Sequence, residues 1–95
     1  MDVYSQIVQK IIEGQEAIIG PVAVEQAEQI GNLKLDWTKH EVTVIGNGAE
    51  VVESLIQAYE RLFGQISVEV SKESVAGLLK TLPAEKLPSI LRSKV

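Results

Sequence analysis

His40 is the one histidine of this chain, and it lies between two carboxylates, Asp36 and Glu41. A histidine beside carboxylates can begin an acid–base pair or a metal site. Either chemistry needs further groups that converge from distant segments, whereas a histidine in a polar turn is usually just hydrated. These residues are the one polar cluster from which an active site could be built. We predict neither a catalytic residue nor a metal ligand among them.

A second stretch that could form a functional site is the turn Gly46-Asn47-Gly48, which follows a predicted strand and precedes a predicted helix. Backbone N–H groups at a helix N-terminus attract anions such as phosphate. A dinucleotide-binding fingerprint would need a third glycine where Val51 stands, and the P-loop ending is absent as well. Glu50 adds a negative charge to the first turn, so Asn47 and Glu50 more simply cap the helix. An anion site at Gly46, Asn47 and Gly48 is the alternative.

Residue types that carry nucleophilic or redox chemistry are scarce. The chain has no cysteine, which excludes disulfides, thiolate metal sites and thiol nucleophiles. None of its serines lies in a G-x-S-x-G turn, and no second histidine can build a triad. Carboxylates three residues apart, such as Glu50 and Glu53, are typical of a solvated helix face. The sequence therefore predicts no enzyme and no cofactor; an active site shared between subunits is a rival hypothesis.

The apolar period of an amphipathic helix runs from about residue 3 to residue 30. Gly20-Pro21 interrupts it, and a proline inside a helix removes a hydrogen bond and clashes with the preceding turn. Gly31-Asn32 is a typical helix end. The sequence therefore predicts a bent N-terminal helical segment, with the bend near residue 20.

Residues 33–45 alternate apolar and polar positions on either side of a polar stretch at 38–41, which is the pattern of a β-hairpin. Trp37 falls near the end of the first predicted strand. The clearest helix of the chain follows, since Asn47 is a plausible N-cap and Gly64 a typical end. Between these two residues the apolar positions make one broad face.

Residues 65–71 fit two patterns. Ile66, Val68 and Val70 alternate with polar residues as in a third strand, but they also join an apolar face that is clearly helical from Ser74 onward. We favour the helix and keep the strand as the alternative. The predicted fold class is α+β: a small, mostly helical domain with a bent N-terminal helical segment, one β-hairpin, a capped central helix and C-terminal helices.

Charge is unevenly spread along the chain. Residues 1–71 hold four basic residues against eleven carboxylates, a balance of −7, whereas residues 72–95 hold five against two, a balance of +3. An acidic body repels nucleic acid and anionic lipid, so we expect neither as a partner. We predict one domain at 1–82 and a short basic segment at 83–95, bounded by prolines. That segment is expected to bind a protein partner through Leu87, Ile90, Leu91 and Arg92.

The N-terminus lacks the basic and apolar regions of a signal peptide. Residues 17–24, which are as long as any uncharged stretch of the chain, are far shorter than the ~20 residues that a membrane span needs. We therefore expect a cytoplasmic protein without a membrane partner.

Hydrophobic residues make up 45% of the chain, which offers more aliphatic surface than one thin hairpin can cover. A domain this small buries only a limited hydrophobic core by itself, so a dimer interface is a favourable place for the remaining aliphatic surface. We predict a homodimer contact at Ile11, Ile18 and Val22. The sequence thus indicates a non-enzymatic protein-interaction or regulatory module, with a small-ligand or anion-binding domain as the alternative.

Overall fold

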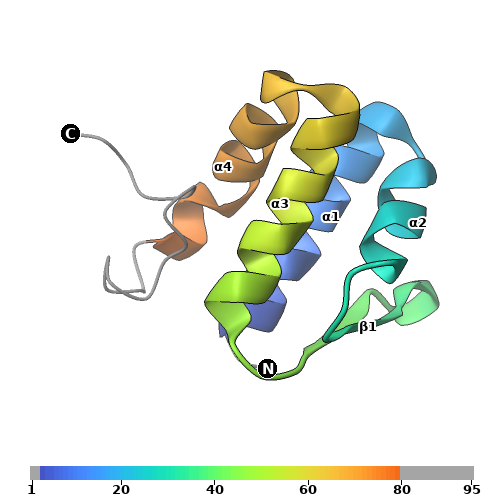
Figure 1. The fold of residues 1–95 in the computed structure, drawn as a ribbon, viewed down its shortest axis with the longest axis vertical. Helices are drawn as coiled ribbons and strands as arrows, with labels where there is room; N and C mark the ends of the chain where they lie inside the picture. The colour runs from blue at the N-terminus through green and yellow to red at the C-terminus, as the bar shows by residue number, and fades with distance from the viewer. Residues whose placement is uncertain (1–2, 80–95) are drawn as a thin grey trace.

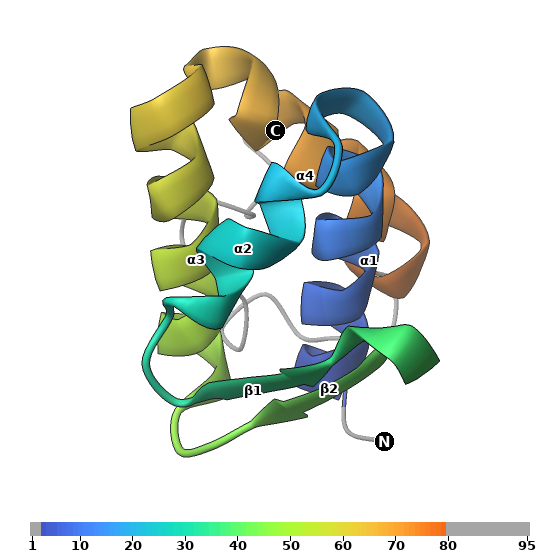
Figure 2. The ribbon, with the colours of Figure 1, turned by 90° about the vertical axis from the view of Figure 1, so that its right-hand side faces the viewer.

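Gly20 and Pro21 divide the N-terminal helical stretch into two helices, as the sequence predicts. The structure is a computed structural model and describes residues 3–79 (Figure 1). Helix α1 (Val3–Ile19) ends where Gly20 takes a left-handed φ of 76°, and α2 (Val22–Glu28) begins after Pro21, at φ −59°. The proline ring imposes that φ, which also suits the start of a helix. Helix α2 therefore folds back beside α1 (Figure 2).

Strands β1 (Leu33–Asp36) and β2 (Glu41–Val44) form the predicted hairpin, paired antiparallel with Leu33 opposite Val44. A short 3-10 helix, η1 (Trp37–Lys39), and His40 in the left-handed region at φ 52° join them. Trp37 therefore belongs to the turn rather than to the strand. In Figure 2 the hairpin lies across the end of the bundle at which α1 begins and α2 ends.

Helix α3 (Gly48–Phe63) begins and ends where the sequence predicts. Asn47 precedes it with extended backbone, and the side-chain oxygen of Asn47 accepts a hydrogen bond from the backbone N–H of Glu50 at 3.2 Å. That bond satisfies one of the N–H groups that the first turn leaves without a helical partner. At the other end Gly64 takes φ 82°, a conformation that glycine adopts without steric penalty.

Helix α4 (Gln65–Leu79) follows Gly64 directly and runs back antiparallel to α3 (Figure 1). Residues 65–71 are therefore helical, and the alternative of a third strand is wrong. The predicted fold class, a mostly helical α+β domain with one hairpin, is confirmed.

The predicted boundary at residue 82 and the basic segment 83–95 lie outside the described residues. Leu87, Ile90, Leu91 and Arg92 lie there with them. In the part of the chain that is described, none of the helices combines the length and the apolar character needed to cross a bilayer.

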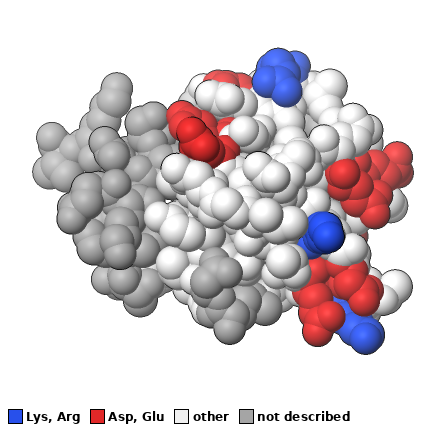
Figure 3. All heavy atoms as spheres, turned by 60° about the horizontal axis from the view of Figure 1, so that its bottom comes forward, with Lys and Arg blue, Asp and Glu red and all other residues white. Residues whose placement is uncertain are grey.

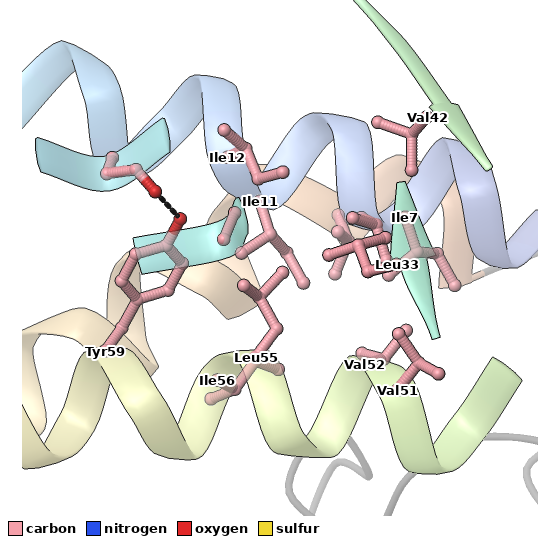
Figure 4. Close-up of a cluster of buried hydrophobic side chains, with 14 of the residues drawn as sticks. Ile7, Ile11, Ile12, Leu33, Val42, Val51, Val52, Leu55, Ile56 and Tyr59 are labelled. Carbon is pink, nitrogen blue, oxygen red and sulfur yellow. Dashed lines mark hydrogen bonds between the residues drawn. The ribbon is translucent and has the colours of Figure 1, made fainter. Parts of the chain in front are cut away.

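The hydrophobic core lies chiefly between α1 and α3, where Figure 4 shows Ile7 and Ile11 of α1 facing Val52 and Leu55 of α3. Helix α2 closes one side of the core, and the hairpin closes one end (Figure 2). Among residues 3–79, Tyr59 is the largest fully buried side chain, and its hydroxyl donates to the backbone carbonyl oxygen of Ala23 in α2 at 2.6 Å (Figure 4). A buried hydroxyl needs such a partner, so this bond holds α2 against α3 in one position.

Candidate functional site

Three aliphatic side chains are more than half exposed at one end of the helical bundle. Ile18 is 62% exposed, Leu62 54% and Ile66 63%. Ile18 lies in the last turn of α1, Leu62 in the last turn of α3 and Ile66 in the first turn of α4. These helix ends lie together, opposite the hairpin (Figures 1 and 2). We call the three residues the apolar end.

Two links hold the helix ends in this arrangement. Gly64 alone joins α3 to α4, so Leu62 and Ile66 lie on either side of one sharp turn. One turn before the exposed isoleucine of α1, the side-chain amide of Gln15 donates to the backbone carbonyl oxygen of Ser67 at 2.8 Å. The end of α1 is thereby bound to the start of α4. Aliphatic side chains exposed together in this way are typical of an interaction surface.

The predicted dimer residues Ile11, Ile18 and Val22 do not form one surface. Ile11 is fully buried in the core, so it is not available to a second copy. Val22, the first residue of α2, is partly buried. Ile18 is the one of the three that belongs to the apolar end. Leu62 and Ile66 are not among the predicted contact residues, although two aliphatic residues that flank a helix-ending glycine are a signal for such a surface.

In the turn Gly46-Asn47-Gly48 each residue has a structural role. Gly46 has a left-handed φ of 78°, and Asn47 caps α3. Gly48 is buried, and a Cβ added to it would overlap the ring of Tyr4 and lie 2.7 Å from the Cβ of Tyr4. The second glycine is therefore needed for the close approach of α1, and phosphate binding is not required to explain the motif.

A shallow groove of about 410 Å³ lies beside this turn, between the α2–β1 connection and the first half of α3. Asn32 and Asn47 line it together with two carboxylates of α3, Glu50 and Glu53. Fixed negative charge at the groove opposes the entry of an anion. The turn and the groove together give little support to the anion site predicted as the alternative.

His40 pairs with α1 and not with its sequence neighbours Asp36 and Glu41. Its Nδ1 lies 3.0 Å from Oε2 of Glu13, and its ring stacks on Trp37 with centroids 4.2 Å apart. The indole Nε1 of Trp37 donates to both carboxylate oxygens of Glu16 at 3.3 Å. The histidine and the tryptophan therefore fasten the hairpin turn to one face of α1.

Burial raises the pKa of the Glu13 carboxyl, but hydrogen bonds from His40 and Gln9 and the charge of Lys10 outweigh it. The pKa of Glu13 therefore lies below its ordinary value of 4.5. Among residues 3–79, no three metal-ligating side chains lie close enough together to hold an ion. This cluster accordingly reads as a structural contact between the hairpin and α1.

Figure 3 looks toward the end of the domain that carries the hairpin. In this view acidic and basic side chains lie interspersed along the right-hand side and at the top of the face, and its centre is largely uncharged. Lysine and arginine of the described residues do not gather into one patch there. On this face, the side chains of residues 3–79 form no basic stripe of the kind typical of nucleic-acid binding.

A scan of protein-family models, a search of curated proteins and a search of solved structures each find no match to this chain.

Proposed function

We propose that this domain is a non-enzymatic protein-interaction module that associates with a second copy of itself through the apolar end. The observation that carries the proposal is the exposure of Ile18, Leu62 and Ile66, each above one half, at the meeting point of three helices. Burying an exposed aliphatic side chain stabilises an association by roughly 1.5–3 kcal/mol. A small domain gains most from such burial because its own core is limited.

The apolar end can be tested by placing a charge on it. Ile66→Glu is expected to abolish association, because a carboxylate buried against aliphatic side chains is strongly unfavourable. Ile45→Glu is the matched control: Ile45 is 43% exposed but lies in the connection between β2 and α3, away from the apolar end. Size-exclusion chromatography of both variants should separate the two cases. Equal elution of the wild type and the Ile66 variant at all concentrations would refute the proposal.

The basic segment is proposed to contact a protein partner, with Leu87, Ile90 and Leu91 as apolar contacts and Arg92 as a charged one. This proposal is based on the uneven charge along the chain. A positively charged segment favours a partner with an acidic surface. We also propose a cytoplasmic location, which a chain without cysteine fits.

The anion-binding alternative has weaker support, because Asn47 is engaged as a cap and Glu50 and Glu53 line the adjoining groove. A phosphate titration followed by NMR is expected to leave the amide resonances of residues 46–49 unshifted. Saturable shifts confined to those amides would favour the alternative.

A further inference from the structure

We propose that the second copy binds by exchanging helix α4. In this dimer α3 and α4 straighten into one helix at Gly64, and α4 of each chain packs on α1 of the other. The inference rests on the proposed self-association and specifies its geometry.

A single residue, Gly64, forms the hinge. It has φ 82°, and a Cβ added to it would meet nothing within 4 Å. Its backbone N–H already donates to the carbonyl oxygen of Glu60 at 2.8 Å, so the hydrogen bonding of α3 reaches the hinge. A change in the backbone of this one glycine therefore suffices to convert the turn into continuous helix. Short connections of this kind favour domain swapping.

When α3 and α4 form one continuous helix, Leu62 and Ile66 of one copy can pack against the same residues of the other. Leu62 and Ile66 are four residues apart, and in a continuous helix positions i and i+4 lie on the same face, one turn apart. A helix from residue 48 to residue 79 is about 48 Å long, so its second half extends beyond the end of its own α1. Two such helices that cross at their hinges bring the Leu62 and Ile66 pairs of both copies together.

The contact of α4 with α1 includes a buried polar network that exchange preserves. The described buried residues of α4 are two serines and two valines, Ser67, Ser71, Val68 and Val75. Gln15 of α1 donates to Ser67 O at 2.8 Å and to Ser71 Oγ at 3.1 Å. Val68 and Val75 belong to the hydrophobic core and Leu78 packs against it. Exchange restores this apolar contact in the partner, and the same hydrogen bonds form again with the partner's α1.

The area that a stable dimer needs also favours exchange over simple docking. A specific interface buries about 1,600 Å² in total, and three aliphatic side chains per copy supply only part of that area. Exchange adds the whole contact of α4 with α1 and α3 to the intermolecular surface. A second copy is the occupant because the surface that α4 vacates is complementary to α4 itself.

The hinge predicts the effect of a side chain at position 64. Gly64→Ala strains the left-handed turn of the monomer but favours continuous helix, so the dimerisation constant should rise by about tenfold or more. Gly46→Ala is the matched control, because Gly46 has φ 78° and open space around it but follows β2, away from both the exchanged segment and the apolar end. An equal effect of both substitutions on the dimerisation constant would overturn the exchange.

Cysteine bridges identify which α4 packs on which α1. A Cβ built on Gly14 lies 3.2 Å from the Cβ of Ser74, within a few tenths of an ångström of disulfide geometry, and the native chain has no cysteine. Gly14→Cys with Ser74→Cys is therefore oxidised in the isolated dimer fraction and run on a denaturing gel without reductant. We expect covalent dimers.

The outcomes separate the two proposals. Bridged chains of monomer mass from a dimeric sample would overturn the exchange while leaving self-association at the apolar end intact. A wild type and a Gly64→Ala variant that stay monomeric at high micromolar concentration would overturn both. The comparison of Gly64→Ala with Gly46→Ala decides the question independently if the double cysteine variant fails to fold.

Discussion

Gln15 of α1 and Ser67 of α4 are joined by a hydrogen bond of 2.8 Å, in which the side-chain amide of Gln15 donates to the backbone carbonyl oxygen of Ser67. Gln15 is 1% exposed, and its amide also donates to Ser71 Oγ, which in turn donates to the same carbonyl oxygen. A fully satisfied buried polar network fixes how two helices pack, because each alternative arrangement leaves a polar group without a partner. This network sets the position of α4, and with it the position of Ile66.

Gln15→Ala should lower the free energy of unfolding by about 1–3 kcal/mol, because it removes the donor to two buried acceptors. Gln57→Ala on the exposed face of α3 is the matched control, and its effect should stay within about 0.5 kcal/mol. Urea denaturation checks both values. Equal stability of the two variants would mean that the Gln15 network contributes nothing.

Alanine substitutions at two glycines should change the stability of the fold in opposite directions. Gly48→Ala should destabilise the fold by about 1–3 kcal/mol, because the new methyl group overlaps the buried side of Tyr4 and forces its ring to move. Gly77→Ala in α4 meets nothing within 4 Å and should stabilise the helix by about 0.5–1 kcal/mol. Thermal unfolding measures both. A stabilising Gly48→Ala would contradict the packing of Tyr4 on the start of α3.

Tyr59→Phe should cost about 1 kcal/mol, because it removes the buried hydrogen bond to the carbonyl oxygen of Ala23. Burial, together with the nearby charge of Glu16, raises the pKa of the Tyr59 hydroxyl well above its ordinary value of 10.0. In the unfolded chain the hydroxyl ionises first, so the wild type should lose stability as the pH rises above 10. The phenylalanine variant should lose this part of the alkaline decline. Parallel alkaline profiles would contradict the buried hydroxyl.

The Glu13–His40 pair should affect how the free energy of unfolding depends on pH under acidic conditions. The folded state holds the pKa of Glu13 below its ordinary value of 4.5, so its stabilising effect is present above that pH. It is lost as the pH falls from there through the lowered folded value. Glu13→Gln should therefore flatten the decline of the unfolding free energy as the pH falls below about 5. An unchanged acid decline would show that the pair is not formed in solution.

Local sequence signals place most helix boundaries correctly. Gly20-Pro21 and Gly64 end helices through their own backbone preferences, and Asn47 caps α3 with its own side chain, so no distant contact is needed. These signals depend on a few neighbouring residues and can be read without the fold.

Predictions that depend on tertiary contacts are less complete. Residues 65–71 are ambiguous because α4 buries serines rather than a continuous aliphatic stripe, and their partner, Gln15, lies more than 50 residues away. His40 pairs with Glu13, 27 residues earlier, and not with the adjacent carboxylates. Ile11 has the pattern of either a core or an interface residue, and only the packing of α3 against α1 distinguishes the two.

Self-association through the apolar end is the central claim, and sedimentation equilibrium of the wild-type chain tests it most directly. The mass should rise with concentration from that of the 10.4 kDa chain toward twice that value across the micromolar range. A single monomer mass up to high micromolar concentration would contradict the claim.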